Sequence, residues 1–288
     1  MKFKPSILLL LLPLAGLSFA LPLTRPAETA EPWRILVTND DGIETPGISA
    51  LVQALQGIGE VWVCAPAENC SGSSQSVRLL QGETKVEQRT MAGAKKAWAV
   101  YATPADSVNV GLVEFTGERP FDLVISGINR GSNVGLIAHY SGTVGAAKEG
   151  LMHGVAAMAV SQSSRYGQDY RRSAKAAAWF AAELLKRGPT PGVLYSLNVP
   201  HAAEETPLQF QAAPMGGRYL TIEEFDHREG ENAGVRWLKA KLSRNPKAPA
   251  GSDSEVYAQG KISVTPILLD ATATEIVQTL NQWKWPTQ

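Results

Sequence analysis

Short apolar runs alternate with longer segments of helical spacing between residues 35 and 200. The pattern predicts strands and helices in turn. The expected strands cover residues 35–38, 60–65, 98–101, 121–126, 155–161 and 193–198. The expected helices cover residues 46–57, 105–115, 143–153 and 170–187. Such alternation indicates parallel βαβ units with helices on both faces. Right-handed crossovers then predict a doubly wound, mostly parallel sheet in a three-layer α/β fold.

The alternation of strand and helix patterns ends at Pro200. Residues 213–252 are rich in Gly, Arg, Lys and Glu, with aromatic residues interspersed and no clear period. We expect this stretch to form a hairpin arm that packs on the core or on a second subunit. A strand over 261–268 and a terminal helix over 272–283 follow. Because no low-complexity linker separates two cores, we expect one domain over 34–288, with its core at 34–200 and an extension at 201–288.

The first twenty residues resemble a secretory signal peptide. Lys2 and Lys4 precede an apolar block at 7–17, which ends in a small-x-small pattern at Ala20. We expect cleavage after Ala20, a spacer over 21–33, and a periplasmic or secreted protein. The block is shorter than the roughly 20 residues that span a bilayer, so no membrane span is expected after cleavage.

Charge and cysteine content limit the possible partners. The chain has 27 Lys and Arg residues against 27 Asp and Glu residues, and the basic residues are scattered. No electrostatic footprint for a nucleic-acid polymer is present, so an anionic ligand must be held locally. Cys64 and Cys70 are the two cysteines, and an oxidising compartment would permit them to pair. A core-facing Cys64 would prevent that bridge, and the sequence leaves both states open.

Polar loops follow the expected strands. Ligands of an open parallel sheet sit outside the carboxyl ends of its strands, and four polar segments are predicted at that edge. They are Asn39-Asp-Asp-Gly42, Asn69-Cys-Ser-Gly-Ser-Ser-Gln-Ser76, the glycine-rich stretch 127–135 with Asn129 and Asn133, and Tyr140-Ser-Gly-Thr143. The stretch 127–135 is expected to be loop throughout. We expect the four segments to form one site.

The residue types in these loops favour a hard cation beside an anion. Asp40 and Asp41 repel each other, and a cation held between them would resolve the conflict. Carboxylate, hydroxyl and amide oxygens suit Mg²⁺, Mn²⁺ or Ca²⁺, whereas no zinc pattern is present. A helix start at Ser141-Gly142-Thr143 would hold an anion such as phosphate. Together these features predict hydrolysis of a phosphate ester, in which a metal activates water.

Simpler explanations exist for each element. Asn-Asp-Asp-Gly also forms turns, a serine-rich loop is often a solvated turn, and Ser141 could be a helix cap alone. A serine nucleophile with His139 would lack the Gly-x-Ser-x-Gly elbow. The stretch 127–135 also lacks the Gly-Lys-Ser/Thr ending of a P-loop.

Seven segments, taken in order, resemble the SurE family of survival-protein nucleotidases. They are Ile35–Ile48, Ala65–Ser76, Thr103–Asp106, Ser126–Gly135, Tyr140–Gly150, Ser196–Pro200 and Ile262–Pro266. The similarity runs from Arg34 to the terminal helix. The match of all segments in order is much more specific than any one motif.

The resemblance implies a Rossmann-like core and a C-terminal extension that exchanges between subunits of a homodimer or homotetramer. It implies a 5'/3'-nucleotidase with one divalent metal per subunit, which hydrolyses nucleoside monophosphates to nucleoside and phosphate by metal-activated water. The implied metal ligands are Asp40, Asp41, Ser71 and Asn129. The implied catalytic residues are Asp40, Asn39 and Ser141. The implied phosphate-binding residues are Gly42, Ser74, Asn129, Ser141, Gly142 and Thr143.

Two positions depart from the family pattern. Ala102–Ser107 stands where Gly-Thr-Pro-x-Asp-Cys is usual, and Cys70 replaces a common basic residue. Loss of that charge is expected to change substrate preference more than activity. A signal peptide is a further departure. Alternative functions are a broader acid phosphatase or exopolyphosphatase, and a periplasmic protein that binds a phosphorylated ligand without turnover. The sequence leaves the preferred base, the 5' or 3' position and the native metal open.

Overall fold

Nine strands form the central sheet of the protein. The computed structural model describes residues 31–203, 205–244, 248–283 and 285–286, and the predicted signal peptide lies outside them. The strand order is β3-β4-β2-β1-β5-β6-β7-β11-β8. In chain order the strands are β1 (Trp33–Thr38), β2 (Gly59–Pro66), β3 (Val86–Arg89), β4 (Lys96–Val100), β5 (Leu123–Arg130), β6 (Ala156–Gln162), β7 (Val193–Val199), β8 (Phe210–Ala212) and β11 (Ile262–Leu268). All neighbours are parallel except β3 with β4 and β11 with β7, so the predicted mostly parallel sheet is confirmed.

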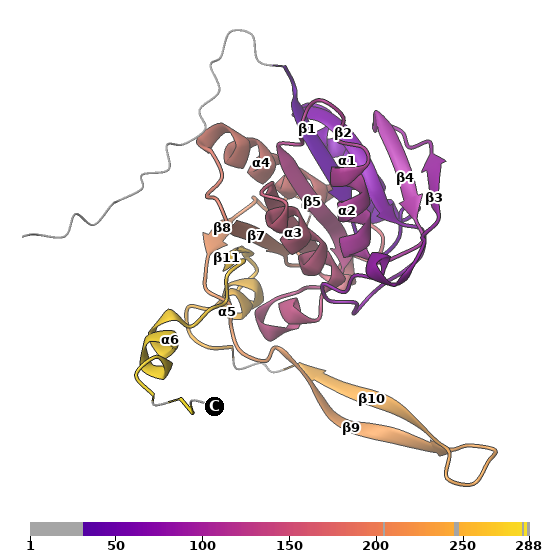
Figure 1. The fold of residues 1–288 in the computed structure, drawn as a ribbon, viewed down its shortest axis with the longest axis vertical. Helices are drawn as coiled ribbons and strands as arrows, with labels where there is room; N and C mark the ends of the chain where they lie inside the picture. The colour runs from indigo at the N-terminus through magenta and orange to yellow at the C-terminus, as the bar shows by residue number, and fades with distance from the viewer. Residues whose placement is uncertain (1–30, 204, 245–247, 284, 287–288) are drawn as a thin grey trace, which may run out of the picture.

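Helices cover both faces of this sheet (Figure 1). They are α1 (Pro46–Leu55), α2 (Pro104–Val113), α3 (Gly142–Met152), α4 (Arg171–Arg187), α5 (Asp253–Ala258) and α6 (Thr274–Leu280), with 3₁₀ turns at Leu79–Gln81, Gly135–His139 and Ser164–Tyr166. α1 contacts α4 on one face, and α2 contacts α3 on the other. The doubly wound, three-layer α/β class predicted from the sequence is therefore the observed one. Within the described residues, every helix is too short or too polar to span a bilayer.

The central strand shows why an unbroken apolar run folds here. Ile35 and Val37 join the hydrophobic cluster under α1 and α4, whereas Leu36 joins the cluster under α2 and α3. Successive side chains of a strand point to opposite faces, so a strand with both faces covered must be apolar throughout. All three side chains are fully buried. This packing fixes the position at which β1 ends and its polar loop begins.

The expected loop over 127–135 is wrong at its start. β5 continues to Arg130, and its pairing with β6 shifts register between Ser126 and Asn129. A glycine is needed in the shifted stretch, since Gly127 has a φ of +142° and a Cβ there would lie 2.4 Å from the Val160 carbonyl oxygen. The glycines of this segment therefore allow β5 to continue as an irregular strand. Asn129 is the second-last β5 residue paired with β6.

The C-terminal extension contains the expected hairpin. β9 (Leu220–Glu229) and β10 (Arg236–Arg244) pair antiparallel as a separate two-stranded sheet. Figure 1 shows this arm projecting away from the body of the protein, with α6 standing off a different side. The short elements β3, β8 and α5 were not expected, because three to six residues are too few for a visible period. The helix expected over 272–283 is shorter, at Thr274–Leu280.

Candidate active site

The turn after β1 is built by the side chain of Asn39. Its Nδ2 donates to the Gly42 carbonyl (2.8 Å) and to Thr45 Oγ1 (3.0 Å), and its Oδ1 accepts from the Gly42 N–H (3.2 Å). Gly42 has a φ of +110°, a conformation that favours glycine. Asn39 is fully buried. Its amide is thus committed to holding the turn that presents Asp40 and Asp41.

Asp40 connects three of the four polar loops. Its carboxylate accepts a 2.6 Å hydrogen bond from Thr143 Oγ1 at Oδ1, which joins the end of β1 to the start of α3. Its backbone carbonyl accepts from the Cys70 N–H at 2.8 Å, which brings the serine-rich loop alongside. The side chain is 3% exposed. No Lys, Arg or His of the described residues forms an ion pair with it.

Asp41 connects the remaining loop. The Arg130 backbone N–H donates to Asp41 Oδ2 at 3.1 Å, so the carboxylate lies beside the end of β5. The preceding residue, Asn129, uses its Nδ2 to bond the Gly131 carbonyl at 2.8 Å. Its Oδ1 accepts no hydrogen bond from the described residues and so remains available to a ligand. A carboxylate and a neutral amide oxygen are therefore presented from adjacent strands.

The serine-rich loop is fastened to α3 and to the segment before it. Ser74 donates from its N–H to the Tyr140 carbonyl (3.1 Å) and from its Oγ to the His139 carbonyl (2.8 Å). Gln75 Nε2 donates to Glu149 Oε2 at 2.9 Å. The hydroxyl of Ser74 is thus engaged with backbone, although the sequence comparison implied a phosphate contact for it.

The start of α3 has the features of an anion site. Ser141 is the N-cap, and its Oγ accepts from the Val144 N–H at 3.2 Å, which leaves its hydroxyl proton available to donate. Gly142 has no side chain to cover the first turn, and a Cβ there would lie 2.8 Å from Asp40 Cβ. The first N–H groups of a helix and its dipole favour a phosphate. The anion position therefore adjoins the Asp40 carboxylate.

Burial raises the pKa of both carboxyl groups. The pKa of Asp40 is raised to about 6, mainly by burial and further by the charge of Asp41, while the Thr143 hydrogen bond opposes the rise. Burial also raises the pKa of Asp41, opposed by the Arg130 N–H and guanidinium. Two neighbouring carboxyl groups held in this state would be stabilised as carboxylates by a shared cation.

The donor set fits a hard divalent cation. No group of three or more His, Cys, Asp and Glu side chains that could bind a metal occurs in the described part of the chain. A cation here would instead be held by Asp40, Asp41 and neutral oxygens. Asn129 Oδ1 is the candidate neutral oxygen, because the next residue, Arg130, donates its N–H to Asp41. Such an oxygen set suits Mg²⁺, Mn²⁺ or Ca²⁺.

The structure thus brings the four predicted segments together at one edge of the sheet. Ser71, the predicted hydroxyl ligand, lies on the exposed part of its loop, with its N–H bonded to Asn69 Oδ1 at 3.0 Å. Sequence reasoning missed Ser73, whose Oγ is buried against Gly142. No sequence signal separates Ser73 from the other serines of this run, because which hydroxyl turns inward depends on the fold of the loop.

Pockets flank the site on both sides. One of about 380 Å³ is lined by residues that include Cys70, Ser71, Arg78 and Tyr101. Another of about 480 Å³ is lined by residues that include Arg130, Arg165, His201, Tyr219 and Tyr257. Each shares residues with a site loop, so each can receive the part of a substrate beyond its phosphate.

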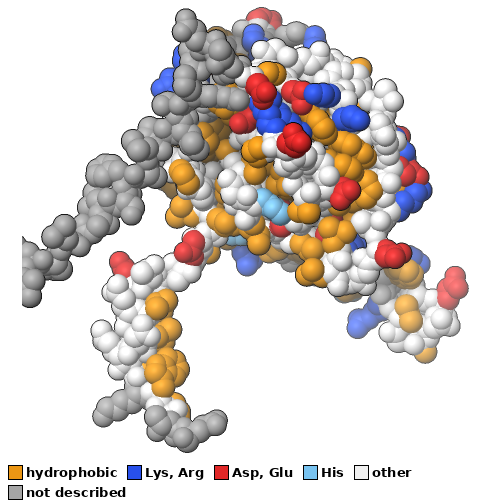
Figure 2. Space-filling model, turned by 45° about the horizontal axis from the view of Figure 1, so that its top comes forward, with side chains coloured by type: hydrophobic (Ala, Val, Ile, Leu, Met, Phe, Trp, Pro, Cys, Tyr) orange, Lys and Arg blue, Asp and Glu red, His pale blue; other side chains and the backbone are white. Residues whose placement is uncertain are grey.

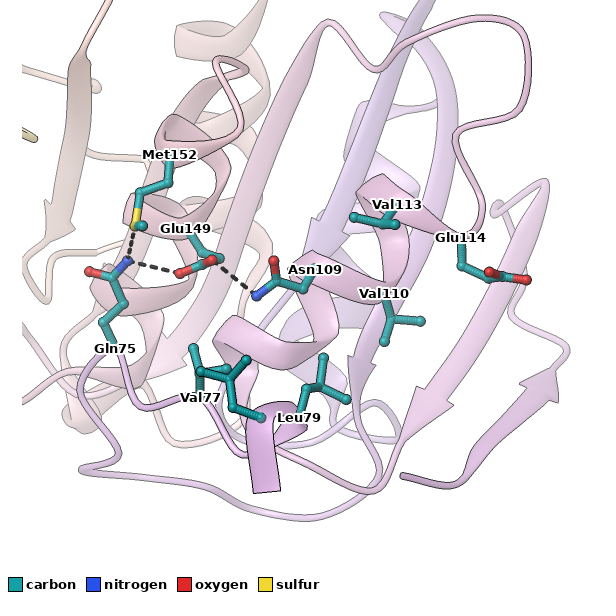
Figure 3. A pocket seen from close by; sticks show the side chains of 10 residues that line it. Gln75, Val77, Leu79, Asn109, Val110, Val113, Glu114, Glu149 and Met152 are labelled. Atoms are coloured by element: carbon teal, nitrogen blue, oxygen red, sulfur yellow. Dashed lines mark hydrogen bonds between the residues drawn. The ribbon is translucent and has the colours of Figure 1, made fainter. Parts of the chain in front are cut away.

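A third pocket, of about 700 Å³, lies between α2 and α3 (Figure 3). Its lining is mostly apolar and includes Val77, Val110 and Met152. Figure 3 shows Gln75 and Asn109 directed at the Glu149 carboxylate from opposite sides. An apolar lining does not suit a phosphate, so we assign this region to the support of the serine-rich loop.

The two cysteines are unpaired in the structure. Cys64 is buried in the core, and burial raises the pKa of its thiol far above the usual range. Cys70 Sγ lies 3.6 Å from the Ala102 carbonyl oxygen as a donor. The sequence left open whether Cys64 and Cys70 form a disulfide. Cys64 is buried in the core, which is the arrangement expected to prevent that bond.

The chain is similar to known proteins of one family. The family model described as Survival protein SurE matches residues 35–221. The chain is 36% identical to the 5'-nucleotidase SurE of Heliobacterium modesticaldum over 87% of this chain and 91% of that protein. It is 35% identical to the 5'-nucleotidase SurE of Rhodopirellula baltica over 87% of this chain and 98% of that protein.

A solved structure is similar over the same extent. The crystal structure of the SurE protein from Aquifex aeolicus matches with a TM-score of 0.74 and 30% identity, covering 86% of this chain and 98% of that chain. The family model covers more than half of the chain, and the relatives are matched over nearly their full length. The chain therefore belongs to the SurE family of survival proteins.

Proposed function

We propose that this protein is a nucleotidase that hydrolyses nucleoside monophosphates to nucleoside and phosphate with the help of a divalent metal. The observation that carries the proposal is the junction of Asp40 with Thr143, which places a buried carboxylate beside a helix start suited to phosphate. The names of its relatives, 5'-nucleotidase SurE, support the same reaction.

The residues divide the work as follows. Asp40, Asp41 and Asn129 would hold one Mg²⁺, Mn²⁺ or Ca²⁺, which when bound lowers the pKa of water and offsets charge at phosphorus. Ser141, Gly142 and Thr143 orient the phosphate through backbone N–H groups at the start of α3 and through the Ser141 hydroxyl, since the Thr143 hydroxyl donates to Asp40. Asn39 positions the two aspartates through the turn. Ser71 stays a predicted metal ligand.

A broader phosphatase is the second candidate. The pocket that contains Arg130 and Arg165 adjoins the site through the backbone contact of Arg130 with Asp41. Guanidinium groups bind phosphates, so this pocket favours substrates that carry further phosphates, such as short polyphosphate. The Cys70 position, which lacks a basic side chain, also bears on substrate preference, because it lines the opposite pocket.

We also propose export and self-assembly. The amino-terminal sequence supports a signal peptide cleaved after Ala20 and a periplasmic or secreted protein.

Self-assembly is supported by the described residues of the extension over 201–288, which leave apolar side chains exposed. Figure 2 shows hydrophobic side chains along the segment around α6, where Ile276 and Trp283 are 56% and 58% exposed. Such surface is typical of an interface, and a homodimer or homotetramer would bury it.

The decisive experiment measures phosphate release by the mature protein, stripped of metal and then given Mg²⁺, Mn²⁺ or Ca²⁺. The substrates are 5'- and 3'-nucleoside monophosphates, short polyphosphate and an aryl phosphate. Metal-dependent release that favours nucleotides supports the nucleotidase. Equal or faster release from polyphosphate supports the broader phosphatase. Stoichiometric binding of a nucleotide without release in any metal supports a binding protein instead.

A further inference from the structure

Ser73 contains a buried hydroxyl that has no hydrogen-bond partner among the described residues. The next serine along, Ser74, has its hydroxyl bonded to the His139 carbonyl. Burying a hydroxyl without a partner destabilises the folded state, so native proteins retain such groups chiefly where they have a use. The Ser73 hydroxyl is therefore a candidate for contact with a ligand.

The backbone, and not the side chain, holds Ser73 in place. Its N–H donates to the Cys70 carbonyl, and its carbonyl accepts from the Ser76 N–H, both at 3.2 Å. The loop around it is fastened by Ser74 and Gln75. The fold of this loop consequently makes no use of the Ser73 hydroxyl.

The hydroxyl faces the helix start that the site offers to phosphate. A Cβ on Gly142 would lie 2.6 Å from Ser73 Oγ and 3.0 Å from Asp40 Oδ2, so both oxygens border the space over the first residue of α3. Only a glycine at position 142 permits this approach. A hydroxyl in this position adds a side-chain donor to the backbone N–H groups of the first turn.

We infer that the Ser73 hydroxyl donates a hydrogen bond to the phosphate of the substrate and is a further phosphate-binding residue of this enzyme. The inference rests on the proposed function for the identity of the substrate. Phosphate rather than the metal is the assigned partner, because Ser73 Oγ lies over Gly142 at the helix start, where negative charge is favoured. Binding then supplies the partner that the hydroxyl lacks in the free protein.

The test compares Ser73→Ala with Ser76→Ala, a matched change on the exposed part of the same loop. Inorganic phosphate is titrated by calorimetry into each metal-loaded protein, and Mg²⁺ or Mn²⁺ is titrated separately. Ser73→Ala should weaken phosphate binding about tenfold, the scale of a charge-assisted hydrogen bond. It should leave metal affinity unchanged and should not lower the melting temperature of the metal-free protein. Ser76→Ala should change none of these quantities.

Turnover provides a second readout. With a nucleoside monophosphate, Ser73→Ala should raise KM or lower kcat/KM by a similar factor, whereas binding of the unphosphorylated nucleoside should be unaffected. Unchanged phosphate affinity overturns the inference, and so does a loss of metal affinity with phosphate binding intact, since Ser73 would then be a metal ligand. Should the wild-type protein bind phosphate but hydrolyse no nucleotide, the proposed function fails while the role of Ser73 in anion binding is still measured.

Discussion

Thr143 Oγ1 donates a 2.6 Å hydrogen bond to Asp40 Oδ1 across 103 residues of sequence. One partner follows the central strand β1, and the other lies in the first turn of α3. The bond helps to orient the Asp40 carboxylate, whose Oδ2 lies beside the space over Gly142. One contact therefore joins a predicted metal ligand to the helix start that we propose binds phosphate.

Replacing Asp40 by Asn should separate function from stability. Metal-dependent phosphate release is expected to fall at least a hundredfold, because a charged ligand is lost. The metal-free variant should unfold with a free energy up to about 3 kcal/mol higher at pH 7, since a carboxyl with a pKa raised to about 6 no longer has to ionise. Chemical denaturation measures the second effect. Asp270→Asn, on the surface, serves as the control, and near-normal turnover in Asp40→Asn would exclude the ligand role.

The stability of the metal-free protein should decrease as pH rises from about 4 to about 7 through the contribution of Asp40. Its folded pKa, about 6, lies above the ordinary value of 3.8, so the folded state binds the proton more tightly. The penalty is absent below pH 4 and complete above pH 7, and the raised pKa of Asp41 acts in the same direction. Urea titrations at several pH values test this against Asp40→Asn, whose curve should be flatter. Identical slopes for the two proteins would contradict it.

Gly142→Ala should close the phosphate position. The added methyl would lie 2.6 Å from Ser73 Oγ and 2.8 Å from Asp40 Cβ, so both neighbours must move. We expect kcat/KM to fall at least a hundredfold, with phosphate affinity lost in calorimetry. Gly57→Ala is the matched control, because no atom lies within 4 Å of its added methyl. A variant that binds phosphate normally would show that the space over α3 is not the anion position.

Glu149→Gln should loosen the serine-rich loop. The buried carboxylate accepts from Gln75 Nε2 at 2.9 Å and from Asn109 Nδ2 at 3.0 Å, and an amide can accept at only one of its two ends. Loss of one of these bonds should lower the unfolding free energy by about 1–3 kcal/mol and raise KM severalfold. Gln75→Ala should reproduce the rise in KM with a smaller loss of stability. If KM stays constant in both variants, the anchor does not position the loop.

Val277→Lys in α6 should weaken self-association. Val277 is 43% exposed and lies beside Ile276 on a helix that stands off the body. A charge introduced into an apolar interface is expected to shift the assembly toward the monomer by tenfold or more in dissociation constant. Sedimentation velocity across micromolar concentrations measures the change. Val113→Lys is the control, because it makes the same substitution at an exposed valine of α2. A wild-type protein that sediments as a monomer would refute the assembly.

Patterns that repeat over many residues allowed the core of the fold to be predicted. The apolar run at 35–38 is buried on both faces of the sheet, so its sequence and its environment agree. The run at 127–130 could not be recognised as strand, because the glycine that permits its irregular pairing is also the residue typical of loops. Short strands such as Phe210–Ala212 depend on pairing with β11 rather than on their own sequence.

The site was predictable to the level of loops. Topology brings the carboxyl ends of parallel strands to one edge, so the meeting of Asp40, Asp41 and Thr143 followed from their positions after strands and before a helix. The direction of each side chain did not follow. Asn39 turns inward to hold the turn, and Ser73 rather than Ser74 has the unbonded hydroxyl, because hydrogen bonds between distant segments decide these orientations.

The hairpin of β9 and β10 should be recognisable in solution by fast exchange of its amide protons. As a sheet of two strands, it is paired on one side of each strand only, and its outer N–H groups face water. An isolated hairpin is marginally stable, so its amide protons should exchange with deuterium far faster than those of β1, which has a neighbour on each side. Slower amide exchange at particular residues of the arm would therefore show where another chain covers them.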